Sequence, residues 1–99
     1  MDVVELFVSH RAEDELRQIW RYVAAENPAA ADQLLLRIDE KLQFLRDFPA
    51  IGTQRDDIRP GFRMLVEGNY LLLYEYQAAD GAVELVAVVD GRRDLSDLF

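Results

Sequence analysis

Residues 62–89 have the sequence FRMLVEGNYLLLYEYQAADGAVELVAVV, in which three apolar stretches are separated by two short turn signals. Gly68-Asn69 and Asp80-Gly81 are residue pairs that tolerate the tight backbone of a β-hairpin. This pattern predicts three strands joined as an antiparallel meander, at residues 62–66, 70–77 and 83–89.

The last of these strands alternates along its length. Its pattern predicts one face made of Val83, Leu85, Ala87 and Val89. Toward its end the opposite face is apolar as well. A strand with two apolar faces is typical of the interior of a sheet, where something covers each side.

The chain before this meander has a helical period. A first apolar stripe predicts a helix of about four turns, with Ser9 as its N-cap. The stripe consists of Ala12, Leu16, Ile19, Trp20 and Val23. We expect Trp20 to lie in the core between this helix and the sheet. Asn27-Pro28 signals the start of a second helix, which ends before Phe48-Pro49.

Together these signals predict an α+β fold with the element order β-α-α-β-β-β. Residues 3–8 form the first strand, and residues 50–61 form a loop. The two helices form a hairpin packed on an antiparallel sheet. Because 99 residues suit one domain around a single core, we assign residues 1–99 to a single domain.

Composition narrows the classes of function. The chain carries 19 acidic and 11 basic residues, and its net charge of -8 opposes extended contact with DNA or RNA. It has no cysteine, which excludes disulfides, thiolate metal sites and a cysteine nucleophile. No apolar run approaches the ~20 residues of a membrane helix, and the N-terminus lacks the features of a signal peptide. We therefore expect a cytoplasmic protein without direct membrane contact.

Groups suited to catalysis are sparse. The single histidine, His10, neighbours Ser9 at a helix start, where adjacent residues do not face each other. No nucleophilic triad is therefore expected. One histidine with scattered carboxylates does not make a metal site either. We expect no catalytic residues, no cofactor and no metal.

Arginines offer a different kind of site. All five basic residues of the second half lie in two groups, Arg55, Arg59 and Arg63, and then Arg92 and Arg93. They either pair locally with neighbouring aspartates or contact a partner, and the sequence leaves both interpretations open.

The tyrosines of the second half leave two similar interpretations open. Tyr74 shares one face of its strand with Tyr70 and Tyr76, because side chains alternate along a strand. This face either packs within the sheet or contacts a partner, since tyrosine is favoured where a partner buries a surface.

Several motifs occur in a fixed order along the chain. The second half contains Asp56-Asp57-Ile58-Arg59-Pro60-Gly61-Phe62-Arg63, Gly68-Asn69-Tyr70, Leu73-Tyr74-Glu75-Tyr76 and the ending Val86-Ala87-Val88-Val89-Asp90-Gly91-Arg92-Arg93-Asp94. The first half contributes residues 12–22, then Ala30, Ile38, Leu45 and residues 48–52. Together they resemble the ParE branch of the RelE/ParE toxin superfamily, and the resemblance covers nearly the whole chain.

The resemblance implies the toxin component of a type II toxin-antitoxin system, of the kind associated with plasmid stabilization. Such a toxin is neutralised by a cognate ParD-like antitoxin, in a heterotetramer or larger complex. For the ParE branch it also implies inhibition of DNA gyrase by binding, with no covalent chemistry by the toxin. The residues that we expect to contact the antitoxin or the target are Arg59, Arg63, Tyr74, Arg92 and Arg93.

Two alternatives stay open. A RelE-like member would be a ribosome-dependent mRNA endonuclease with basic and acid–base side chains near the sheet and the C-terminus. That set is not visible here, because Lys41 is the only lysine and lies on the second helix. A degenerate member would bind an antitoxin without being toxic.

Overall fold

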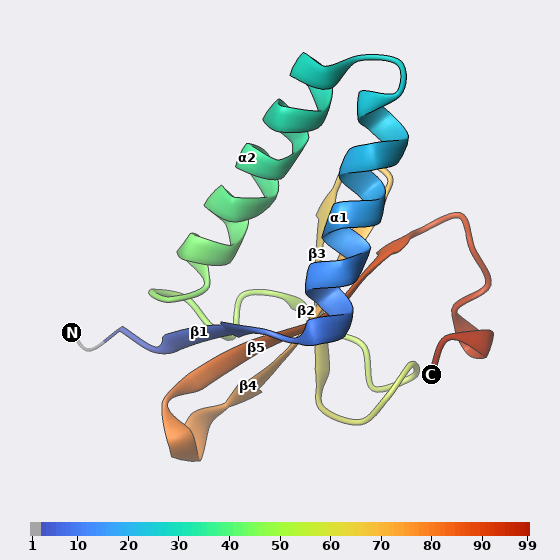
Figure 1. The fold of residues 1–99 in the computed structure, drawn as a ribbon. Helices are drawn as coiled ribbons and strands as arrows, with labels where there is room; N and C mark the ends of the chain where they lie inside the picture. Colours follow the sequence, from blue (N-terminus) through green and yellow to red (C-terminus); the bar gives the residue numbers. More distant parts are fainter. Residues whose placement is uncertain (1–2) are drawn as a thin grey trace.

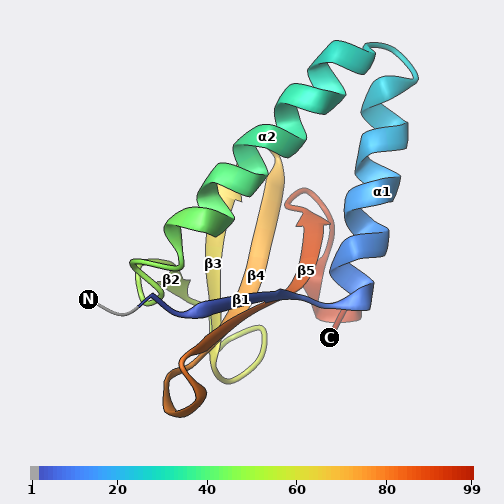
Figure 2. The same ribbon diagram turned by 60° about the vertical axis from the view of Figure 1, so that its left-hand side comes forward.

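Two helices lie on one face of a sheet in the computed structural model, which describes residues 3–99 (Figures 1 and 2). The elements are β1 (Glu5–Val8), α1 (His10–Ala24), α2 (Pro28–Phe44), β2 (Thr53–Gln54), β3 (Phe62–Glu67), β4 (Tyr70–Gln77) and β5 (Ala82–Asp90). Short 3-10 turns follow β4 at Ala78–Asp80 and β5 at Leu95–Asp97. The predicted α+β class is confirmed.

Each helix begins where its capping residue predicts, and α2 ends at Phe44, four residues before Phe48-Pro49. Ser9 Oγ accepts a hydrogen bond from the backbone N–H of Ala12 at 3.0 Å and caps α1. Asn27 Oδ1 accepts from the N–H of Ala30 at 3.1 Å, and Pro28 is the first residue of α2. The short connection makes α1 and α2 neighbours, with α1 over β5 and α2 beside β3. Neither helix within residues 3–99 is long and apolar enough to cross a bilayer.

The sheet is mixed rather than purely antiparallel, which corrects the predicted fold. Its strand order is β1-β5-β4-β3-β2, and β1 runs parallel to β5, with Glu5 paired to Ala82 and Val8 to Leu85. The meander β3-β4-β5 is antiparallel as predicted. β5 therefore lies between two strands, which confirms its predicted interior position.

A second correction concerns the segment expected to be only a loop. Thr53 and Gln54 form β2, paired with Met64 and Arg63 at the edge of β3. A two-residue strand is too short to show an alternating pattern, so it gave no signal in the sequence.

A third correction concerns the faces of β5. Val86 is an extra residue of β5, because Tyr74 of β4 pairs with Leu85 while Leu73 pairs with Ala87. Such a bulge reverses which side chains point to which face. The four residues expected on one face are divided, with Val83 and Leu85 toward the helices and Ala87 and Val89 away from them.

The sheet carries an apolar cluster on each face. The cluster beneath the helices includes Ile38 and Leu42 of α2 with Leu72 of β4. The cluster on the opposite face is built around Phe62 and Leu73, and it is covered by Ile58, Leu95 and Leu98 from the loop before β3 and the segment after β5. Both faces are therefore sealed from water by segments far apart in the sequence.

Trp20 does not lie between helix and sheet, contrary to our prediction. Its indole Nε1 donates to Asp32 Oδ1 of α2 at 2.8 Å, and the ring is half-buried at a shallow cleft beside Leu16 and Leu35. Trp20 lies at the margin of the apolar stripe, whereas its neighbour Ile19 packs against the core. The tryptophan therefore ties the two helices to each other.

Candidate functional site

A groove of about 450 Å³ lies between α1 and the end of β5. α1 contributes one helical face, and β4, β5 and the residues after β5 contribute the other wall. We call this the α1–β5 groove, and its lining residues are Glu15, Gln18, Ile19, Tyr22, Tyr70, Val88, Asp90, Arg92 and Arg93. It places both arginines of the chain's basic ending beside aromatic and apolar side chains.

The basic ending, residues 91–94, leaves the sheet in a defined turn. The N–H of Gly91 donates to the carbonyl oxygen of Asn69 at 2.7 Å. Arg92 donates from its backbone N–H and from Nε to Asp90 Oδ1, both at 2.9 Å. The turn is closed by the N–H of Arg93, which donates to the carbonyl oxygen of Asp90 at 3.1 Å.

Asp90 organises the charge of this turn. Hydrogen bonds from Arg92 hold the pKa of the Asp90 carboxyl at about 2, below its usual value of 3.8. Asp90 is therefore ionised near neutral pH and offsets the charge of Arg92. Arg93 is exposed and lines the same groove.

Two tyrosines form the aromatic part of the groove. Tyr22 of α1 is 74% exposed, whereas Tyr70 of β4 is half-buried. Burial, followed by the nearby charge of Asp90, raises the pKa of the Tyr70 phenol. Tyrosine beside arginine is the composition favoured at protein–protein contacts.

Arg59 and Arg63 lie toward the opposite end of the sheet, whereas Arg55 lines a small cleft with Asp94 and the segment that follows it. β3 starts at Phe62, paired with Glu75, and ends at Glu67, paired with Tyr70. Arg59, before β3, lies 3.7 Å from Glu75 across Nη2 and Oε1, and its side chain is 54% exposed. Arg55 pairs with Asp57, which confirms local pairing for that residue as for Arg92. The structure therefore does not bring Arg59 together with the basic ending.

Arg63 has a structural role in the loop before β2. Its Nη1 donates to the carbonyl oxygens of Ala50 and Gly52, both at 2.9 Å. The guanidinium thus closes the loop with two hydrogen bonds, and less of it is available to a partner than the sequence suggested.

Tyr74 is buried, so the expectation that it contacts a partner directly is wrong for this conformation. Its exposed fraction is 0%. The phenol donates to the carbonyl oxygen of Pro49 at 2.9 Å and accepts from the N–H of Gly52 at 2.8 Å. A Cβ at position 52 would lie 2.5 Å from the phenol oxygen, which explains the glycine there. Of the two interpretations left open, packing within the fold holds for Tyr74.

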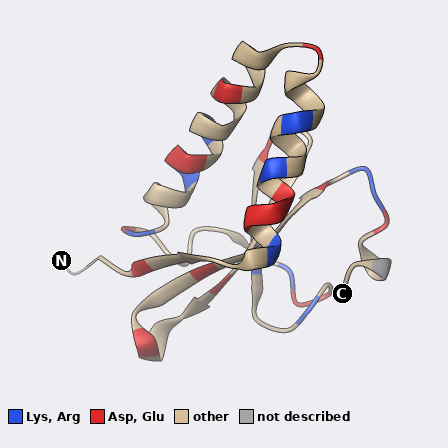
Figure 3. Cartoon of the chain, in the orientation of Figure 1, with Lys and Arg blue, Asp and Glu red and all other residues tan. Residues whose placement is uncertain are grey.

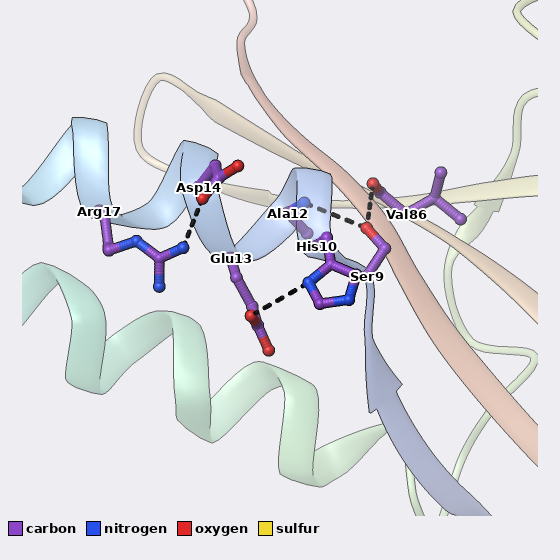
Figure 4. Close-up of polar contacts among 7 residues, drawn as sticks. All are labelled: Ser9, His10, Ala12, Glu13, Asp14, Arg17 and Val86. Carbon is purple, nitrogen blue, oxygen red and sulfur yellow. Dashed lines mark hydrogen bonds and ion pairs between the residues drawn. The ribbon is translucent and has the colours of Figure 1, made fainter.

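The residues around the start of α1 do not form a catalytic triad (Figure 4). Ser9 Oγ donates to the carbonyl oxygen of Val86 at 2.7 Å while it caps the helix, so the hydroxyl has structural partners. His10 is exposed, and its Nδ1 lies 4.0 Å from Glu13 Oε2. Among the side chains that the structure describes, which exclude residues 1, 2 and 97, no group of three or more from histidine, cysteine, aspartate or glutamate could hold a metal ion.

Charge is distributed unevenly over the molecule. Figure 3 shows acidic and basic residues on both helices, acidic residues on the strands, and a blue stretch flanked by red on the loop that leaves β5. Arg92 and Arg93 thus present two guanidinium groups between Asp90 and Asp94, so residues 90–94 carry no net charge, two basic residues balancing two acidic ones, in a chain with a net charge of -8. Because screening limits the reach of distant charges to about 8 Å, the immediate neighbours of each guanidinium determine its local field.

Comparison with known proteins identifies the family. Residues 6–95 match the family model described as "ParE toxin of type II toxin-antitoxin system, parDE". This chain belongs to the ParE toxin family. It is 31% identical over 83 residues to Toxin ParE3 of Caulobacter vibrioides, covering 83% of this chain and 81% of the relative. It is 29% identical over 89 residues to Toxin ParE1 of Mycobacterium tuberculosis, covering 89% and 90%.

Solved structures agree on the fold of this ParE-family chain. A chain of the chromosomal ParDE TA system from P. aeruginosa superposes with a TM-score of 0.72 at 19% identity, covering 89% of this chain and 96% of that chain. The isolated E. coli RelE toxin gives a TM-score of 0.65, also at 19% identity, with coverages of 92% and 87%. At this identity the likeness concerns the fold alone.

The sequence predicted Arg92 and Arg93 as contact residues, but it did not predict the residues that α1 contributes to the groove. Glu15, Gln18 and Tyr22 recur at spacings of three and four, which places them on one face of α1 beside the core stripe. That spacing was the available signal. It could not indicate that this face lies against the basic ending, because the bulge in β5 decides that.

Proposed function

We propose that this ParE-family toxin inhibits DNA gyrase by binding it and is neutralised by a cognate ParD-like antitoxin. The observation that carries the proposal is the α1–β5 groove, where Arg92 and Arg93 stand beside Tyr22 and Tyr70. Arginine and tyrosine contribute disproportionately to binding energy at protein contacts. Gyrase held as a cleavage complex would require such contacts and no covalent chemistry by the toxin, which would act in the cytoplasm.

The single lysine of the chain has structural partners. Lys41 Nζ donates to the carbonyl oxygen of Val66 at 2.8 Å and to Glu67 Oε1 at 3.0 Å, on the side of the sheet that faces α2. The net charge of -8 also opposes binding to RNA. These observations favour a protein target over the RelE-like alternative.

An antitoxin segment would find apolar surface on this chain. Phe44 and Phe48 stack with ring centroids 4.7 Å apart, and both are about half exposed, as is Ile51. The cleft at Trp20 and Leu35 is a second apolar feature. A segment that wraps the toxin could cover both and bury their surface. Membership of the family described for the parDE system supports an antitoxin of the ParD type, and we propose a heterotetramer or larger complex as the assembly.

The gyrase target is tested with purified components. Folded wild-type protein added to gyrase, ATP and relaxed plasmid should suppress supercoiling and leave cleaved plasmid after protein removal. The variant with Arg92→Ala and Arg93→Ala should be much weaker. A matched variant with Arg17→Ala and Arg46→Ala removes two arginines elsewhere and should retain inhibition. Unimpeded supercoiling by gyrase in the presence of equimolar wild-type protein would refute the gyrase proposal.

Expression in cells separates the remaining alternatives. Growth arrest with intact messages is expected for a gyrase inhibitor, whereas message cleavage at ribosomes would indicate the RelE-like alternative. Unchanged growth despite folded protein would indicate a degenerate member. If a small reading frame lies directly beside the gene and encodes the antitoxin, its co-expression should restore growth.

A further inference from the structure

The first turns of α1 hold the strand that leads into the basic ending. β1 ends at Val8, where it pairs with Leu85, but β5 continues to Asp90 along α1. The N–H of Ser9 donates to the carbonyl oxygen of Leu85 at 3.0 Å, and its hydroxyl donates to that of Val86 at 2.7 Å (Figure 4). The bulged residue is therefore fixed by the residue that caps α1.

Glu15 provides the next attachment along β5. Its Oε1 accepts a hydrogen bond from the backbone N–H of Val88 at 3.0 Å, and its side chain is only 20% exposed. At this point β1 has ended, so a helix carboxylate occupies the place of a neighbouring strand. Without Glu15 this strand amide would lose its acceptor at a partly buried edge.

Arg11 holds the chain on the other side of the basic ending. Its Nη1 donates to the carbonyl oxygen of Leu98 at 3.2 Å, and its guanidinium lies 4.4 Å from the ring centroid of Phe99. Its Nε lies 3.5 Å from Glu15 Oε2, so the two attachments are joined to each other. Phe99 also packs edge-on against Phe62, at 5.2 Å between centroids.

The bulge at Val86 directs the end of β5 toward the α1–β5 groove. Beyond Val86, the side chain of Val88 faces the core beneath the helices, and Asp90 lines the α1–β5 groove. Arg92 donates a hydrogen bond to Asp90 and therefore lies on the same side of the sheet. With regular alternation from Leu85, Asp90 would instead face the opposite side of the sheet.

We propose that Glu15 and Arg11 are positioning residues for the basic ending, and that together with Ser9 they set where Arg92 and Arg93 meet the target. We call these three residues the α1 clasp. The clasp acts through β5 and the C-terminal segment; Glu15 itself also lines the α1–β5 groove, whereas Ser9 and Arg11 are not among its lining residues. The proposal rests on the proposed function in one respect, namely that the basic ending is the part that binds.

Glu15→Met and Arg11→Met test the clasp without shortening the side chains on the surface of α1, and Glu15→Gln and Arg17→Met are their controls. Glu15→Met removes the acceptor but keeps the side-chain length and helix propensity, while Glu15→Gln keeps an acceptor oxygen for Val88. Arg11→Met removes the second attachment. Arg17→Met makes the same change on the same helix, at a residue whose ion pair is with Asp14, and serves as the control.

The first readout is independent of any target. In amide NMR, Glu15→Met should accelerate hydrogen exchange at Val88 and shift the resonances of residues 91–93, while exchange at Leu72 in β4 stays unchanged. Glu15→Gln and Arg17→Met should resemble the wild type. Unchanged resonances of residues 91–93 in Glu15→Met and Arg11→Met would overturn the proposal, whatever the target is.

The second readout is inhibition of gyrase supercoiling, arranged as a double-mutant cycle. Glu15→Met should raise the concentration needed for half-inhibition by about tenfold, the order expected when displaced arginines lose part of their contacts with the target. In a background that already carries Arg92→Ala and Arg93→Ala, Glu15→Met should have little further effect. An equal loss in both backgrounds would show that Glu15 acts elsewhere and would overturn the proposal. If wild-type protein fails to inhibit gyrase, the proposed target fails, and the NMR readout still decides the clasp.

Discussion

At the scale of single residues, the Asp90–Arg92 pair predicts a pH dependence. The folded pKa of Asp90 is about 2 against a usual 3.8, so ionised Asp90 favours the folded turn. That contribution is fully present above pH 3.8 and is lost as the pH falls toward 2. Arg92→Ala should return the pKa of Asp90 toward 3.8, measured by NMR titration of its carboxyl carbon. Arg93→Ala should leave it near the wild-type value, and equal midpoints in the two variants would contradict the assignment of Arg92 as the cause.

Tyr74 provides a second prediction at this scale. Tyr74→Phe should lower the free energy of unfolding by about 1–3 kcal/mol, because the N–H of Gly52 and the carbonyl oxygen of Pro49 lose their partner. Tyr22→Phe removes the same hydroxyl from a side chain that is 74% exposed and should change stability little. Chemical denaturation of both variants measures the difference. Equal stability of the two would show that the buried hydrogen bonds contribute nothing net.

The role of Tyr74 also shows what a strand pattern can predict. A period of two correctly placed Tyr70, Tyr74 and Tyr76 on one face. It could not give the depth of burial, because Tyr74 is covered by the loop at Pro49 and Gly52, whose path depends on contacts distant in sequence. The same limit applies to Arg63, whose partners are carbonyl oxygens of that loop.

At the scale of elements, Glu67 joins β3 to α2. It accepts from Lys41 Nζ at 3.0 Å and from Arg37 Nε at 3.1 Å, and the hydrogen bond from Lys41 is the main cause that lowers its pKa. Glu67→Gln should cost about 1 kcal/mol of unfolding free energy at neutral pH. Because the folded pKa is lowered, the wild-type advantage should persist above pH 4.5 and disappear as the pH falls through the folded value.

Denaturant unfolding of both proteins across this pH range measures the Glu67 effect. Glu40→Gln, at an exposed position of α2, is the matched control and should leave stability nearly unchanged. A difference between wild type and Glu67→Gln that stays constant down to the lowest pH would contradict an ionic origin.

Local chemistry predicted most elements, and pairing at long range explains the rest. The starts of both helices followed from Ser9 and Asn27 as N-caps, and the meander followed from its turn signals. The parallel pairing of β1 was missed because a short apolar strand carries no signal of its neighbour or direction. The bulge at Val86 was missed because both faces of β5 are apolar there, so alternation cannot reveal an added residue. The α1–β5 groove depends on both features.

At the scale of the whole molecule, the net charge argues against a nucleic-acid target, and the architecture places Arg92 and Arg93 where a protein partner could contact them. A net charge of -8 opposes attraction to nucleic acid phosphates over long distances. The basic ending leaves the sheet on its own loop, where Arg92 and Arg93 alternate with Asp90 and Asp94, so its guanidinium groups can act only at short range (Figure 3). Recognition of a protein partner by this surface would therefore depend on close contact more than on electrostatic steering.

Because the arginines are separated across the sheet, we expect their removal to affect different properties, namely stability for Arg63 and toxicity for Arg92 and Arg93. Arg63→Ala should lower the unfolding midpoint, because the carbonyl oxygens of Ala50 and Gly52 lose their donor. Arg92→Ala with Arg93→Ala should leave the midpoint nearly unchanged, since both side chains are exposed, yet should abolish growth arrest on expression. Arg59→Ala, at the far end of β3, should retain arrest if the α1–β5 groove alone meets the target. The opposite pattern would contradict this assignment. If folded Arg59→Ala lost growth arrest while the Arg92 and Arg93 double variant kept it, the contact surface would lie at the other end of the sheet.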